Sequence, residues 1–85
     1  MDMFKVLGIL IKDRIKEAGK TQKVLTANNH LIASRLGFHE VSTSTCSRMG
    51  MIILQLKGSP GEWTMLEKQL NAIEGIELQN MTFTA

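Results

Sequence analysis

The sequence predicts an α+β fold with four strands and two helices in the order βαββαβ. Two observations predict this class. The two halves of the chain repeat one pattern, which is a strand, a short polar turn, a helix of about four turns and a second strand. The strand that opens each half is also apolar on both faces. With 85 residues, the chain is expected to form a single domain over residues 1–85, so that all of these elements share one core.

The first predicted strand covers Phe4–Ile11 and is rich in Val, Leu and Ile. Alternate residues point to opposite faces of a strand. One face therefore carries Leu7, Ile9 and Ile11, and the other carries Val6, Gly8 and Leu10. Because both faces are apolar, this strand should be central in the sheet and covered on both sides.

A helix is predicted over Arg14–Asn28, with Asp13 as its N-cap. Ile15, Ala18, Gln22 and Leu25 follow one another at helical spacing and are expected to form its buried stripe. Asn28 and Asn29 predict its end. The second strand is expected over His30–Leu36 and should end at Gly37.

Residues 39–50 are polar, with a hydroxyl-rich middle, and predict a mobile connection between the halves. The third strand is expected over Met51–Lys57. Its residues Ile52, Leu54 and Leu56 would form one face, and Met51, Ile53 and Gln55 the other.

The second helix has the clearest local signal in the chain. Ser59 is a typical N-cap, Pro60 suits the first helical position, and Glu62 completes a capping box. Gly75 predicts a left-handed residue at the end of this helix, and a last strand follows over Ile76–Phe83. The expected buried stripe of the helix is Trp63, Leu66, Leu70 and Ile73.

Two right-handed crossovers joined by a hairpin produce the ferredoxin-like sandwich. Its antiparallel sheet has the strand order 4-1-3-2, and both helices lie on one face. This order places the first and third strands at the centre, which agrees with their apolar composition.

Two helices can cover only one face of such a sheet. Val6, Leu10, Met51 and Ile53 would then form an exposed apolar patch, larger than a monomer normally tolerates. We therefore expect a homo-oligomer, a dimer or a tetramer, formed through the helix-free sheet face or a sheet edge. A terminal tail could cover the patch instead, but the tails are only three or four residues long.

The composition argues against several classes of protein. The longest apolar run, Val6–Ile11, is too short to span a membrane, and the first residues lack the features of a signal peptide. The lone Cys46 cannot form an internal disulfide, so a cytoplasmic location is expected. The net charge is +2, and much of the positive charge lies on one predicted helix, which indicates a solvated helix face rather than direct nucleic-acid binding.

No motif for nucleotide phosphates and no CxxC pair is present. His39 and Cys46 lack an orienting third group, so no catalytic set can be assembled and an enzyme is not expected. No cofactor is expected either. His30, His39 and Cys46 are the possible soft-metal ligands, although their spacing fits no compact motif, and ordinary surface residues are the alternative.

Three segments could bind a small ligand. Lys12, Asp13 and Arg14 open the first helix, and Gly58–Gly61 opens the second; helix N-termini attract anions, with simple capping as the alternative. The third segment is the end of the second strand, where a cation, an aromatic ring and an imidazole cluster. Its residues are Arg35, Leu36, Gly37, Phe38 and His39.

The runs KVLGILIKDR, LIASRLGF and MIILQLKGSPGEWTMLEKQLNAIEGIELQNMTF resemble the iron-only hydrogenase system regulators. These are ACT-like domains, similar in fold to the C-terminal domain of the nickel-responsive repressor. The anchor residues of the resemblance are Asp13-Arg14, Leu36-Gly37 and Gly75. The His-x-His and following Cys that bind nickel in that repressor are not reproduced here.

The resemblance implies a ferredoxin-like fold, side-by-side association of subunits, a regulatory role and a small-molecule effector bound at subunit interfaces. By position, it points to Lys12, Asp13 and Arg14 and to the end of the second strand. The expected function is therefore a small regulatory or ligand-sensing module of an iron-only hydrogenase system. A nickel- or zinc-responsive domain and a ligand-free interaction or assembly factor are the alternatives.

Overall fold

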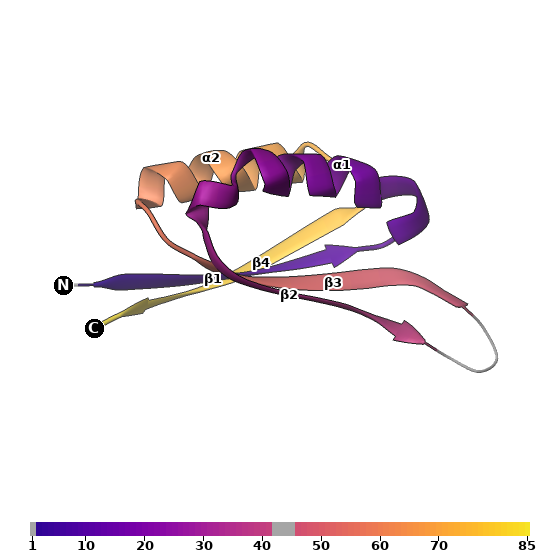
Figure 1. Ribbon diagram of the computed structural model, residues 1–85, viewed down its shortest axis with the longest axis horizontal. Helices are drawn as coiled ribbons and strands as arrows, with labels where there is room; N and C mark the ends of the chain where they lie inside the picture. Colours follow the sequence, from indigo (N-terminus) through magenta and orange to yellow (C-terminus); the bar gives the residue numbers. More distant parts are fainter. Residues whose placement is uncertain (1, 42–45) are drawn as a thin grey trace.

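A computed structural model describes residues 2–41 and 46–85, with the backbone alone for residues 14, 38–41 and 46–48. Its elements follow the predicted βαββαβ order, with one added 3₁₀ turn (Figure 1). They are β1 (Met3–Ile11), α1 (Arg14–Ala27), a 3₁₀ turn (Asn29–Leu31), β2 (Ile32–Val41), β3 (Cys46–Leu56), α2 (Pro60–Asn71) and β4 (Ile76–Thr84).

The four strands form one antiparallel sheet in the order β2-β3-β1-β4, which is the predicted order counted from the other edge. β1 and β3 lie at the centre, with Leu7 opposite Leu54 and Ile9 opposite Ile52. Both helices cover the same face of the sheet, and the other face has no helix (Figure 1). The ferredoxin-like fold is confirmed.

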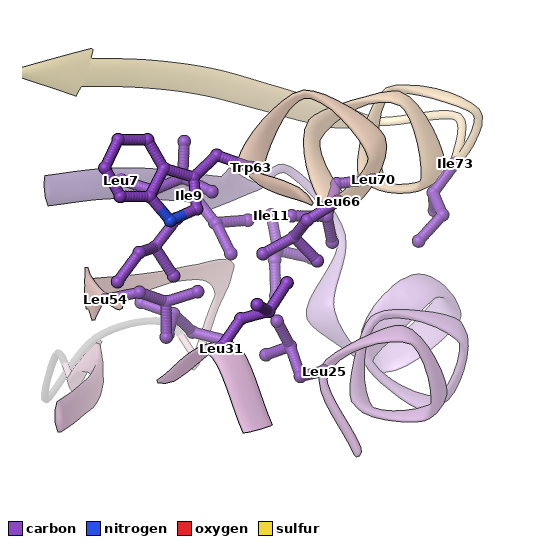
Figure 2. Close-up of a cluster of buried hydrophobic side chains, with 12 residues drawn as sticks. Leu7, Ile9, Ile11, Leu25, Leu31, Leu54, Trp63, Leu66, Leu70 and Ile73 are labelled. Carbon is purple, nitrogen blue, oxygen red and sulfur yellow. The ribbon is translucent and has the colours of Figure 1, made fainter. Parts of the chain in front are cut away.

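The core lies between the sheet and the helices. Leu7, Leu54, Leu66 and Leu70 are fully buried there, and Figure 2 shows the sheet and helix side chains pointing toward one another. The predicted stripe of α2 is confirmed, because all four of its residues are buried. The complete core is Leu7, Ile9, Ile11, Leu25, Leu31, Ile52, Leu54, Leu56, Trp63, Leu66, Leu70 and Ile73.

The start of α2 forms as the sequence predicts, whereas the helix ends at Asn71 with Ala72 as its C-cap, short of the predicted end at Gly75. The Ser59 hydroxyl accepts from the amide of Glu62 at 3.5 Å, and the Glu62 carboxylate accepts from the amide of Ser59 at 3.0 Å. Together they complete the capping box, with Pro60 in the first turn. Gly75 has a φ of 82°, in the left-handed region that favours glycine.

The predicted buried stripe of α1 is wrong at two of its four positions, whereas Leu25 is buried as predicted and Ala18 is half-buried. Ile15 is 65% exposed and Gln22 is also exposed, whereas Glu17, Thr21 and Leu25 are buried. The buried polar groups are partly paired within the helix: the Thr21 hydroxyl donates to the Glu17 carbonyl at 3.0 Å. Polar residues of α1 can therefore face the core. A prediction based on the spacing of apolar residues alone does not find this buried side.

The second and third strands also differ from the prediction. His30 and Leu31 belong to the 3₁₀ turn rather than to β2, and the amide of Leu31 donates to the carbonyl of Asn28 at 2.9 Å. β2 then extends to Val41 and β3 starts at Cys46, so most of the expected connection over residues 39–50 is strand. Backbone hydrogen bonds can hold a polar ribbon without a buried face. The predicted mobility falls in part on residues 42–45, which lie outside the described residues.

Candidate functional site

The helix-free face of the sheet is the main candidate site. The pairing register decides its composition, because residues opposite one another share a face. Val6 lies between Gln55 and Met81, Gly8 between Ile53 and Gln79, and so on along the sheet. We use the name helix-free face for the described side chains Phe4, Val6, Leu10, Ser34, Leu36, Met51, Ile53, Gln55, Glu77, Gln79, Met81 and Phe83, together with Gly8.

This face is mainly apolar and open to solvent. Phe4 and Phe83 are cross-strand neighbours and are 42% and 53% exposed. Met81 and Leu36 are 57% and 62% exposed, whereas the central Val6, Leu10, Met51 and Ile53 are half-buried. These last four are the residues that the sequence assigned to this face, and the structure confirms the assignment.

Two hollows lie on this face. One has a volume of about 560 Å³ and includes Phe4, Leu36, Gln55 and Phe83 in its lining. The other, of about 390 Å³, lies over Gly8 and is lined by Leu10, Met51, Gln79 and Met81 among others. Val6 and Ile53 line both hollows, so the two are neighbours at the centre of the face.

Charge is nearly absent from the helix-free face. Among its described side chains, only Glu77 is an acidic or basic residue, and its carboxylate accepts from the Gln79 amide at 3.4 Å. The exposed lysines Lys16, Lys20 and Lys23 lie on α1, on the other side of the sheet. Chemically, the described side chains of this face can bind an apolar surface, and the nearest cation is Arg35, at the edge of the larger hollow.

The predicted ligand residues at the start of α1 have local partners. The Asp13 carboxylate accepts from the amides of Ile15 and Lys16, at 3.2 and 3.3 Å, and so caps the helix. The backbone amide of Lys12 donates to the Gly75 carbonyl at 2.9 Å, and its side chain is exposed. The side chain of Arg14 lies outside the described part of the chain.

The predicted ligand residues of the second strand lie along β2. Arg35 donates to the Gln22 side chain at 2.7 Å and so connects β2 with α1. Gly37 pairs with Ile52, and Phe38 with Met51. His39 pairs with Gly50, which pairs in turn with Ile11, the last residue of β1. The backbones of His39 and Ile11 therefore lie two strands apart, about 10 Å, at the same end of the sheet.

The three candidate metal ligands are separated. His30 lies in the 3₁₀ turn before β2, and the strand from Ile32 to His39 alone spans roughly 23 Å, which separates the two histidines. Cys46 begins β3 opposite Val41, near the His39 end of the sheet. The His30 imidazole instead lies 4.0 Å from the Glu62 carboxylate. The described residues contain no cluster of three acidic, His or Cys side chains that could hold a metal ion.

The turn at Gly58–Gly61 acts mainly as a helix cap. Hydrogen bonds from the backbone and the hydroxyl of Ser59 hold the pKa of Glu62 below its ordinary value, and His30 adds a smaller effect. Because the capping box occupies the Glu62 carboxylate and an amide of the first turn, this turn offers little to an anion.

The sequence did not assign Phe4, Leu36, Met81 and Phe83 to the helix-free face. The alternation of β4 contained a signal, because Met81 and Phe83 have the opposite parity to the inward-facing Ile76 and Leu78. The signal was missed because exposed apolar residues on an edge strand are common and their meaning depends on the neighbouring strand.

None of the described helices is long and apolar enough to cross a lipid bilayer. In comparisons with known proteins, no model of a protein family matches the sequence, and no curated protein matches it.

Solved structures do match the fold. An uncharacterized protein, TM1266 from Thermotoga maritima, is 23% identical, with a TM-score of 0.81 over 98% of this chain and 100% of its own. A formyltetrahydrofolate deformylase from Pseudomonas putida KT2440 is 10% identical (TM-score 0.57, 94% of this chain), and this chain spans only 28% of it. The de novo designed protein Foldit4 is 13% identical, with a TM-score of 0.56 over 98% of this chain and 97% of its own. At these identities the likenesses show the fold alone, and the chain has the same ferredoxin-like fold as TM1266 over nearly its whole length.

Proposed function

We propose that this chain is a small regulatory or ligand-sensing module of the ACT-like type that acts as a homo-oligomer. The observation that carries the proposal is the helix-free face, on which Phe4, Leu36, Met81 and Phe83 leave large apolar side chains in water. Such a patch marks an interaction surface more often than a free surface. In this proposal, the protein acts through the association of its subunits rather than through catalysis.

The regulatory part of the proposal is supported by the resemblance to iron-only hydrogenase system regulators, and the system regulated would be of that kind.

The proposed effector site is the end of the sheet where β1 leads into α1. The exposed Lys12 lies next to the α1 N-terminus, and the backbone of His39 lies two strands away. Arg35 lies at the level of Leu7, four residues back from that end of the sheet, and donates to Gln22 in the second half of the same helix. The cationic side chains of Lys12 and Arg35 suit a small anionic effector, because charge-assisted hydrogen bonds favour negative charge.

Native mass spectrometry of the purified chain, without chelator or denaturant, tests the proposal. We expect an oligomer, with a small organic mass retained on part of it. A Lys12→Gln/Arg35→Gln variant should keep the subunit number and lose that mass, whereas a Lys68→Gln control on α2 should keep both. A bare monomer at micromolar concentration would contradict the proposal. A stoichiometric metal ion would favour a metal-responsive domain, and an oligomer that never retains a ligand would favour an assembly factor.

A further inference from the structure

We propose that the helix-free face binds a second copy of this chain, with Phe4 of each copy filling the hollow over Gly8 of the other. This inference rests on the proposed homo-oligomer and names the surface and the contact that would form it. We call the hollow lined by Val6, Gly8, Leu10, Met51, Ile53, Glu77, Gln79, Asn80 and Met81 the Gly8 hollow.

The fold itself does not require glycine at position 8. The pairing of β1 with both neighbours runs through Gly8 without a shift in register, so no bulge is present. Gly8 is not among the glycines with a positive φ. A Cβ there would meet the Gln79 carbonyl at 3.6 Å and the Ile53 Cδ1 at 3.7 Å, which are ordinary contacts.

Glycine in the middle of a central strand costs stability and often marks a close approach by another molecule. Gly8 is flanked on its own face by Val6 and Leu10, which are both half-buried. The missing side chain therefore leaves a recess in an otherwise continuous apolar surface. Its volume of about 390 Å³ is ample for a phenyl ring, since a cavity of roughly 150 Å³ accepts benzene.

Phe4 is the side chain that a two-fold arrangement brings to this recess. Phe4, Val6 and Gly8 follow one another on the same face of β1. Consider a two-fold axis that lies in the plane of the interface, perpendicular to β1, and passes over Val6. Phe4 of one copy then lies over Gly8 of the other, and the reverse contact forms at the same time. A two-fold interface requires this kind of self-complementarity.

The size and charge of the helix-free face also suit a second copy. Four strands spaced about 4.8 Å apart and about 30 Å long present roughly 600 Å² per subunit, so that two faces would bury about 1,200 Å². This area lies at the lower bound of stable protein interfaces. Glu77 lines the Gly8 hollow on its Leu10 side, whereas the cross-strand neighbours of Val6, at the centre of the proposed contact, are the uncharged Gln55 and Met81.

Sedimentation equilibrium of the full chain measures the dissociation constant for four proteins: the wild type, Gly8→Leu, Phe4→Ala and the double variant. Gly8→Leu fills the hollow and should weaken association at least 100-fold. Phe4→Ala should weaken it at least tenfold. In the double variant the leucine occupies space that the phenyl ring has left, so association should be weakened at least tenfold less than the product of the two single effects.

Gly19→Leu is the matched control, because Gly19 lies on α1 with nothing within 4 Å of its Cβ position, and it should leave association unchanged. Circular dichroism of each variant verifies the fold. An oligomeric wild type whose association neither Gly8→Leu nor Phe4→Ala weakens would overturn this inference and leave the proposed homo-oligomer intact. Fully independent effects of the two substitutions would overturn the Phe4–Gly8 pairing. A monomeric wild type would overturn both proposals.

Discussion

At the scale of single residues, the N-terminus of α2 shows how side chains can replace missing backbone hydrogen-bond partners. The first amides of a helix have no carbonyl acceptors within the helix. The Ser59 hydroxyl accepts from one of them, and the Glu62 carboxylate accepts in return from the backbone and hydroxyl of Ser59. These bonds favour the ionised carboxylate and lower its pKa.

The lowered pKa of Glu62 predicts a pH dependence of stability. A carboxyl group whose pKa is lower in the folded state stabilises the fold above its ordinary pKa of 4.5, and this contribution is lost as the pH falls through the folded value. Urea denaturation at pH 7 and pH 3 measures the effect. Glu62→Gln should show a smaller loss of stability between the two pH values than the wild type, and an equal loss would contradict the role of the capping box.

Replacing glycine by alanine should have opposite effects on stability at Gly58 and at Gly19. Gly58 has a φ of 97°, and a Cβ there would lie 2.9 Å from Leu31 Cδ2, so Gly58→Ala should destabilise the fold by roughly 1–3 kcal/mol. Gly19 lies in α1 with open space around it, so Gly19→Ala should stabilise the fold by about 0.5–1 kcal/mol. Thermal denaturation compares the two variants, and destabilisation by Gly19→Ala would show that its surroundings are not open.

At the scale of elements, the two helices pack by different means. α2 has an apolar stripe that contacts the sheet, and the Trp63 indole donates to the Lys57 carbonyl at 2.9 Å. α1 buries Glu17 and Thr21 beside Leu25, and Lys20 lies 3.6 Å from the Glu17 carboxylate. Asn28 connects the helices through a 2.8 Å bond from its amide nitrogen to the Gln69 side chain. Polar side chains are therefore buried on α1, whereas the buried side chains of α2 are aromatic or aliphatic.

The buried side of α1 can be tested by two substitutions of aliphatic residues. Leu25→Ala should cost about 2–5 kcal/mol, because it leaves a cavity under the helix. Ile15→Ala should change the free energy of unfolding by less than about 0.5 kcal/mol, since Ile15 is 65% exposed. Chemical denaturation of both variants decides the matter. A large cost for Ile15→Ala would support the stripe first predicted from the sequence.

At the scale of the whole molecule, the two faces of the sheet have unequal cover. Figure 1 shows both helices over one face, and the β2–β3 hairpin extends beyond them. The end of β1 pairs with Gly50, so that the start of β3 continues past β1 with β2 as its neighbour. The molecule measures 48 × 23 × 17 Å, which reflects this extended and thin shape. Small domains with one thin core often depend on association for stability.

If folding and association are coupled, the thermal midpoint should depend on protein concentration. A tenfold increase in concentration should raise the midpoint by roughly 3–6 °C for a chain of this size. Differential scanning calorimetry over a hundredfold range of concentration measures the shift. A midpoint that stays constant over this range would mean that the single chain carries its full stability.

The sequence by itself determined the order of the elements, the fold class, the central position of β1 and β3, and the start of α2. Each of these depends on local chemistry or on a short repeat. Short stretches of sequence are enough to recognise them. Examples are the two apolar faces of Phe4–Ile11, the stripe from Trp63 to Ile73 and the capping box of Ser59 and Glu62.

Only the tertiary structure decided which side of α1 is buried, where the β2–β3 ribbon ends and what the helix-free face contains. Burial of Glu17 and Thr21 depends on partners from other elements and on contacts within the helix that composition does not reveal. Phe4, Ile53 and Met81 become one surface only through the register of three strands, and the recess over Gly8 exists only because its neighbours on those strands are larger. Register joins residues far apart in the chain, so no local pattern contains it.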